Sequence, residues 1–94
     1  MSNSDVSVYV ISVAAEMVGT GVQNLRAYER AGLVTPGRTT GGTRLYSGDD
    51  IDRLRRVAAL LQAGLNLAGI TMVLQLEDEN SRLRTRLGRR REPS

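Results

Sequence analysis

The sequence contains no cysteine and no histidine. The missing cysteines exclude disulfides, thiol redox chemistry and cysteine metal sites. Carboxylates are then the main ligands left, which argues against a transition-metal site, and the commonest general acid–base side chain is absent. We therefore expect neither an enzyme nor a protein that carries a cofactor.

Phenylalanine and tryptophan are also absent, and three tyrosines are the only aromatic residues among 94. A core built from Val, Leu, Ile, Met and Ala is modest at this length, so a partner chain can add burial. The longest apolar run covers residues 57–61 and is too short to span a bilayer. Residues 1–5 lack the pattern of a signal peptide. We expect a cytoplasmic protein with no membrane association.

Lysine is missing as well, so all 13 basic residues are arginines and the net charge is +3. The guanidinium group can bind phosphates and guanine edges with paired hydrogen bonds, which suits nucleic-acid recognition. A GC-rich genome produces the same bias without any functional cause. Both explanations remain open on composition alone.

The first third of the chain predicts two short helices joined by a glycine turn. Apart from Ser7, residues 6–11 are β-branched or aromatic, and they indicate a strand or an extended lead-in. Ser12 is expected to cap a helix over Val13–Val18, and Gly19–Gly21 forms the turn. The second helix is predicted from Val22 to about Ala31. This arrangement is typical of a helix-turn-helix.

The next segment predicts an arginine-bearing hairpin followed by a third helix. Gly41–Gly42 can turn a hairpin, since glycine accepts positive φ at both central positions. The flanking residues 38–40 and 43–46 suit strands, so the hairpin resembles a wing. Ser47 is expected to cap a helix that continues to about Ala63.

A last helix is predicted from about Leu67 to Leu87, with Asn66 as a candidate cap. Its seam positions alternate in steps of three and four residues, which is the heptad spacing of a coiled coil, and Asn80 among them would fix register at a cost in stability. We expect this seam to join two protomers; the alternative is a helix that folds back on its own head. The predicted dimerisation residues are Val73, Leu76, Asn80, Leu83 and Leu87.

These elements divide the chain into three parts. Residues 6–65 are predicted to form the winged helix-turn-helix head, and residues 66–88 the dimerisation helix. Residues 89–94 carry three consecutive arginines and then a proline, and are expected to be a disordered basic tail.

Several motifs in these elements resemble one family. The segment NLRAYERAGLV at residues 24–34 is similar to the LR-x-YER-x-GL segment of MerR-family recognition helices, and residues 41–47 resemble that family's wing. Residues 12–15 resemble its opening, and residues 63–70 resemble the connector of its heat-shock repressor (HspR) branch. The likeness covers roughly residues 8–80. It implies a mainly α fold, with a winged helix-turn-helix head and a C-terminal coiled-coil dimerisation helix.

The resemblance also implies partners. Proteins of this family are homodimers, joined by an antiparallel coiled coil, that bind inverted repeats in promoters on double-stranded DNA. Members of the heat-shock branch repress chaperone operons and can use a DnaK-type chaperone as co-repressor. The chain departs from the family at Ala27, where many members have tyrosine, and it lacks the Cys or His of metal-sensing members.

On the second helix, the resemblance assigns Arg26 a phosphate or base-edge contact, with an ion pair to Glu29 as the alternative. Gln23 and Asn24 occupy the first turn, where side chains reach base edges, although a solvated surface remains open for both. Tyr28 matches a DNA-contacting tyrosine, and core packing explains it equally well. Glu29 is expected to be structural because a carboxylate repels phosphates.

The wing residues Arg38, Arg44 and Tyr46 match the family's wing, and we expect Arg44 to contact a phosphate. Arg38 has a solvated hairpin charge as its alternative, and helix capping is favoured over a phosphate contact for Asn66. The complete predicted DNA-binding set is Ser12, Gln23, Asn24, Arg26, Tyr28, Arg38, Arg44, Tyr46 and Asn66.

The function predicted from the sequence is a promoter-binding regulator, with repression favoured. Two alternatives stay open. A monomeric, excisionase-like architectural DNA binder shares the winged head, and a protein-interaction adaptor would dock its last helix on a chaperone or a sigma factor.

Overall fold

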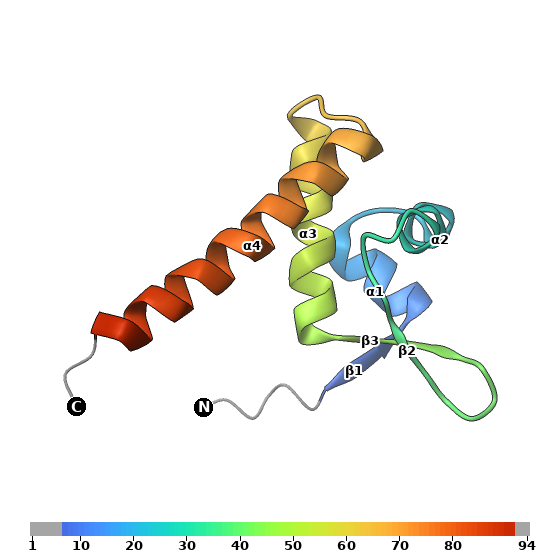
Figure 1. Ribbon diagram of the computed structural model, residues 1–94. Helices are drawn as coiled ribbons and strands as arrows, with labels where there is room; N and C mark the ends of the chain where they lie inside the picture. The colour runs from blue at the N-terminus through green and yellow to red at the C-terminus, as the bar shows by residue number, and fades with distance from the viewer. Residues whose placement is uncertain (1–6, 92–94) are drawn as a thin grey trace.

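The computed structural model describes residues 7–91, with side chains described for residues 7–88. Three short strands form an antiparallel sheet in the order β1-β3-β2, and four helices complete the described part of the chain (Figure 1). The fold is mainly helical with a winged head, as predicted. The elements are β1 (Val8–Val10), α1 (Ile11–Val18), α2 (Val22–Arg30), β2 (Gly37–Arg38), β3 (Arg44–Ser47), α3 (Gly48–Gln62) and α4 (Leu67–Arg91).

Helix α1 begins two residues earlier than predicted. Its N-cap is Val10, which has no side-chain cap, because β1 leads directly into the helix. Ser12 therefore lies inside the first turn, exposed, and the prediction that it caps the helix is wrong. The helix ends at Gly19, whose φ of 83° is the left-handed conformation that glycine adopts without strain.

The hairpin forms where it was predicted, but its turn differs. Of Gly41 and Gly42, only Gly42 has positive φ, at 89°, so the predicted turn with both glycines at positive φ is wrong. The amide of Gly42 donates to the carbonyl of Thr39, and the amide of Thr39 donates to the carbonyl of Thr43. This is the three-residue loop that ends in a left-handed glycine. Arg38 thereby pairs with Arg44 across the hairpin.

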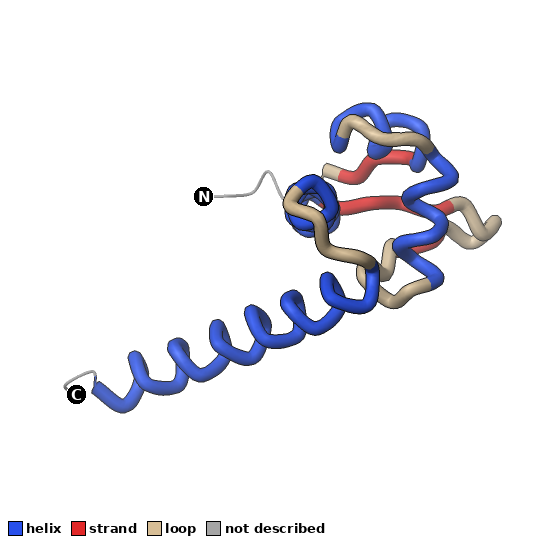
Figure 2. The backbone as a smooth tube through the Cα atoms, turned by 90° about the horizontal axis from the view of Figure 1, so that it is seen from above, coloured by secondary structure: helices blue, strands red, loops and turns tan. Residues whose placement is uncertain are grey.

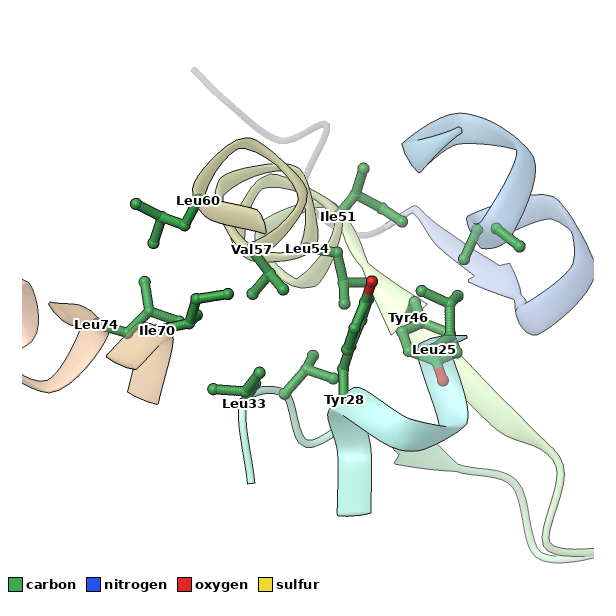
Figure 3. Close-up of a cluster of buried hydrophobic side chains, with 13 residues drawn as sticks. Leu25, Tyr28, Leu33, Tyr46, Ile51, Leu54, Val57, Leu60, Ile70 and Leu74 are labelled. Carbon is green, nitrogen blue, oxygen red and sulfur yellow. The ribbon is translucent and has the colours of Figure 1, made fainter. Parts of the chain in front are cut away.

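The core of the head is aliphatic with two tyrosines in it. Leu25 and Tyr28 from α2 and Tyr46 from β3 meet the apolar stripe of α3, as Figure 3 shows. Ser47 caps α3 as predicted: its hydroxyl accepts from the amide of Asp50, and the Asp50 carboxylate accepts from the amide of Ser47. The thirteen buried residues of this core cluster are Ala14, Ala15, Leu25, Tyr28, Leu33, Val34, Tyr46, Ile51, Leu54, Val57, Leu60, Ile70 and Leu74.

Helix α4 belongs to the head at its start and leaves it afterwards. Ile70 and Leu74 are buried in the same core, so this core extends past the predicted boundary at residue 65. Two ion pairs, Arg53–Asp78 and Arg56–Glu77, join α3 to the turn of α4 that follows Leu74. Beyond them the helix projects away from the other elements (Figure 2). The alternative to the dimer seam, a helix folded back along its own head, is therefore wrong.

The end of α4 also differs from its prediction. The helix continues through Gly88 to Arg91 instead of ending at Leu87, so residues 89–91 of the expected disordered tail are helical. Residues 92–94 of that tail, and the predicted signal-free start at residues 1–5, lie outside the described residues. Within the part that the structure describes, no helix combines the length and apolar character needed to cross a membrane.

Tyr46 carries a buried hydroxyl that has no hydrogen-bond partner among the described residues. Burial raises the pKa of this phenol, because the low-dielectric surroundings disfavour its charged form. A buried, unpaired hydroxyl costs about 1–3 kcal/mol. We therefore expect Tyr46→Phe to raise the free energy of unfolding by about 1 kcal/mol in urea titrations. A loss of stability would show that the hydroxyl has a partner.

Candidate nucleic-acid interface

Helix α2 separates a buried face from a polar one. Leu25 and Tyr28 point into the core, whereas Gln23, Asn24 and Arg26 are exposed. Among the described residues Arg26 makes no ion pair, so the alternative in which it pairs with Glu29 is wrong. The exposed face presents a cation and two amides that can donate to phosphates or to base edges.

The start of α2 is open for an anion. Its N-cap is Gly21, which has no side chain to accept from the first amides of the helix. The amide group of Asn24 donates to the Thr20 hydroxyl at 2.7 Å, which anchors that side chain to the turn. The backbone amides of the first turn of α2 and the positive end of the helix dipole therefore favour a phosphate near this turn.

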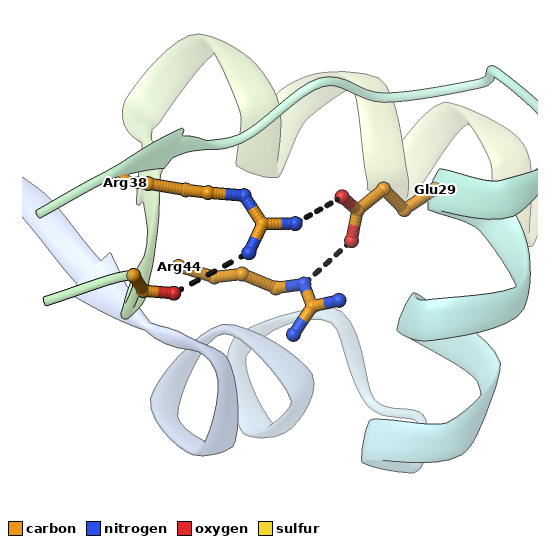
Figure 4. Close-up of polar contacts among 4 residues, drawn as sticks. Glu29, Arg38 and Arg44 are labelled. Carbon is orange, nitrogen blue, oxygen red and sulfur yellow. Dashed lines mark hydrogen bonds and ion pairs between the residues drawn. The ribbon is translucent and has the colours of Figure 1, made fainter.

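Glu29 joins the far end of α2 to the wing. Its carboxylate accepts from the Nε of Arg44 at 2.6 Å and from a terminal nitrogen of Arg38 at 2.9 Å (Figure 4). Sequence reasoning expected Glu29 to be structural, and it is, but nothing in the spacing of residues 29, 38 and 44 identified its two partners. The pairing fixes the wing relative to α2.

The two wing arginines differ in what remains free. Arg38 uses one terminal nitrogen for Glu29 and the other for the carbonyl of Gly42 at 3.3 Å. Arg44 uses only its Nε, so both of its terminal nitrogens are without a partner among the described residues (Figure 4). The terminal nitrogens of Arg44 can therefore bind a phosphate while its Nε stays bonded to Glu29. Arg38 mainly stabilises the hairpin loop.

The arginine contacts hold the pKa of the Glu29 carboxyl below its usual value, with the hydrogen bond from Arg44 as the largest cause. A lowered folded-state pKa stabilises the fold above the unfolded value near 4.5, and this stabilisation is lost as the pH falls through the folded value. We expect Glu29→Gln to destabilise the protein at pH 7 and to have a smaller effect at about pH 3, below the unfolded pKa, as measured by urea unfolding. An equal effect at both pH values would contradict the ion-pair account.

The remaining predicted residues lie elsewhere. Tyr46 is 0% exposed, so its place in the DNA-contacting set is wrong, and Tyr28 is buried, which favours its core alternative. Ser12 is exposed at the start of α1. The side chain of Asn66 accepts from the amide of Gly69 at 2.8 Å, which confirms the helix cap.

The predicted dimerisation seam is exposed along the projecting part of α4. Leu76, Leu83 and Leu87 are 63%, 50% and 53% exposed, and Asn80 is also exposed. Val73 is half-buried against the head. A row of large apolar side chains on a helix that leaves its own core is typical of an interaction surface.

A short helix with an open polar face, braced against an arginine-bearing hairpin, defines the winged helix-turn-helix class of DNA-binding heads. Residues 9–77 match the model of the MerR HTH family of regulatory proteins. The chain belongs to that family.

Individual relatives agree with this assignment. The chain is 51% identical over 83 residues to a putative heat shock protein HspR of Streptomyces coelicolor, covering 87% of this chain and 55% of the relative. It is 36% identical over 73 residues to the transcriptional regulator GlnR of Bacillus anthracis, covering 78% of this chain and 57% of GlnR. The chain thus spans little more than half the length of these relatives.

The fold also matches a solved structure. The crystal structure of HiNmlR, a MerR-family regulator that lacks the sensor domain and is bound to promoter DNA, superposes with a TM-score of 0.66 at 21% identity. The match covers 88% of this chain and 75% of that chain. At this level of identity the likeness concerns the fold.

Proposed function

We propose that this protein is a transcription regulator that binds an inverted repeat in promoter DNA as a homodimer. In each protomer α2 enters the major groove, with Gln23 and Asn24 at base edges. Arg26 and the free terminal nitrogens of Arg44 contact phosphates on either side. The dimer sets the spacing between the two half-sites.

One observation carries the proposal: the Glu29 carboxylate holds both wing arginines against α2, while the two terminal nitrogens of Arg44 have no partner among the described residues. A carboxylate repels the phosphates of DNA, so it is unfavourable at a DNA-binding surface unless it positions the cations around it. Here it neutralises part of their charge and holds them in one geometry. This arrangement supports a preformed grip on a duplex.

The physiological role that we propose is repression of chaperone or other stress genes in the cytoplasm. It rests on the likeness to the Streptomyces coelicolor relative, a putative heat shock protein HspR. A DnaK-type chaperone is the proposed co-repressor. The protein is proposed to act without a cofactor and without catalytic activity.

Selection of bound fragments from the source genome, followed by sequencing, tests the proposal. We expect an inverted repeat with two half-sites that lies upstream of chaperone genes. Inverted repeats at unrelated promoters would support the promoter-binding regulator but rule out the stress role. Binding without preference for any duplex at low salt would reject the regulator itself.

The same protein, studied by sedimentation, separates the alternatives. A dimer on one duplex supports the proposed regulator, whereas a monomer that binds and bends DNA would favour the architectural role. A protein that binds no DNA but captures a chaperone or sigma factor through α4 would favour the adaptor.

A further inference from the structure

The exposed part of α4 carries a charge pattern that its apolar seam does not explain. Three acidic residues, 77–79, precede arginines at positions 82, 84 and 86. All six side chains are exposed. Glu77 and Asp78 are paired with arginines of α3, whereas Glu79 and the three arginines make no ion pair among the described side chains. The unpaired charges are therefore available to a partner.

The heptad places these charges beside the seam. With Val73 and Asn80 at position a, and Leu76 and Leu83 at position d, Glu79 and Arg86 occupy successive g positions. Glu77 and Arg84 occupy the e positions on the other flank. The e flank lies next to the protein's own head, since Glu77 pairs with Arg56. The described g positions Glu79 and Arg86 make no ion pair with the protein's own head. Their charges can therefore favour one arrangement of a second copy over another.

The orientation of a partner helix decides which charges meet. In an antiparallel pair g positions face g positions, and in a parallel pair a g position faces the e position of the next heptad. We propose that Glu79 and Arg86 set the antiparallel orientation and the register of the homodimer, with Glu79 of each protomer facing Arg86 of the partner subunit. The inference rests on the proposed dimer and names the residues that determine its geometry.

The charges distinguish one register of the seam from the next. When Leu76 packs against Leu87 of the partner subunit, Asn80 lies level with the partner's Leu83, and Glu79 meets the partner's Arg86 twice by symmetry. Shifting the partner by one heptad brings Glu79 opposite the partner's Glu79. Like charges at facing positions destabilise a pair of helices, so the shifted register is disfavoured.

Charge reversals in the full chain test this arrangement. E79R and R86E each place two like-charged contacts in the homodimer, so we expect each to raise the dimer dissociation constant about tenfold at low salt in sedimentation measurements. The double variant E79R/R86E restores opposite charges at both contacts and should return to the parent value. Arg82→Glu is the matched control, since it reverses an exposed charge outside the seam and should leave the dimer unchanged.

Mixing the two single variants gives the sharpest outcome. The E79R and R86E chains complement one another in the antiparallel register, and native mass spectrometry should find mainly heterodimers. In a parallel dimer Glu79 faces Arg84 of the partner subunit, so only E79R would weaken the homodimer; that result overturns the proposal. Wild-type affinity in both single variants also overturns it.

The test distinguishes this inference from the proposed function. If the parent protein binds its inverted repeat as a dimer and the charge reversals have no effect, the proposed register is wrong but the proposed regulator still stands. A parent protein that stays monomeric and binds no duplex rejects both.

Discussion

The variant Leu83→Asp is expected to lose most of its affinity for an inverted repeat while its head stays folded. Leu83 is 50% exposed and lies outside the head's core, so a carboxylate there does not disturb the fold. In the dimer it would bury a charge in the seam, which is strongly unfavourable. Because two linked heads gain about 10²–10⁴-fold in affinity, a monomer should bind the repeat about 100-fold more weakly.

Thr85→Asp is the matched control, because it adds the same charge at an exposed position of α4 outside the seam. It should retain both the dimer and the DNA affinity in sedimentation and gel-shift measurements. A Leu83→Asp protein that is still dimeric would place the interface elsewhere. One that is monomeric and yet binds with full affinity would show that a single head suffices.

Arg44→Ala is expected to weaken binding to every duplex alike, by about tenfold, and to reduce the salt dependence of binding. The reason is that a phosphate contact carries no base information, while each neutralised phosphate releases counterions. Gln23→Ala should change which sequence is preferred, with a smaller effect on unrelated DNA. Salt-dependent binding to the selected operator and to a scrambled duplex measures both effects.

Arg82→Ala is the control for charge alone, since Arg82 is an exposed arginine on α4 rather than on the wing. It should leave the preference for the operator unchanged and affect the salt dependence less than Arg44→Ala does. If Arg44→Ala and Gln23→Ala reduce binding to both duplexes equally, the division between phosphate grip and base recognition is wrong.

The spacing of apolar residues, together with glycine turns and helix caps, predicted most of the fold. The glycine turn before α2, the Ser47 cap of α3 and the Asn66 cap of α4 are local signals, and each lies where the sequence placed it. The start of α1 was misplaced because β1 enters the helix without a polar cap. Gly88 did not end α4, since a single glycine lowers helix stability by only about 1 kcal/mol.

The site was harder to predict because its parts meet through space. Glu29 reaches Arg38 and Arg44 across the head, and no motif spacing indicates that a carboxylate will hold both. Tyr46 appeared to be a wing contact because it belongs to the hairpin segment. In β3 successive side chains point to opposite faces of the sheet, and that of Tyr46 points into the core.

The spacing of half-sites tests the account most directly. Once an operator has been selected, about five base pairs, half a helical turn, are inserted between its half-sites, and the number of protomers on each duplex is measured by sedimentation. We predict two protomers on the original operator and a loss of affinity of about 100-fold on the altered one, because the second head would face the wrong side of the helix. Equal affinity for both duplexes, with one protomer on each, would contradict the account.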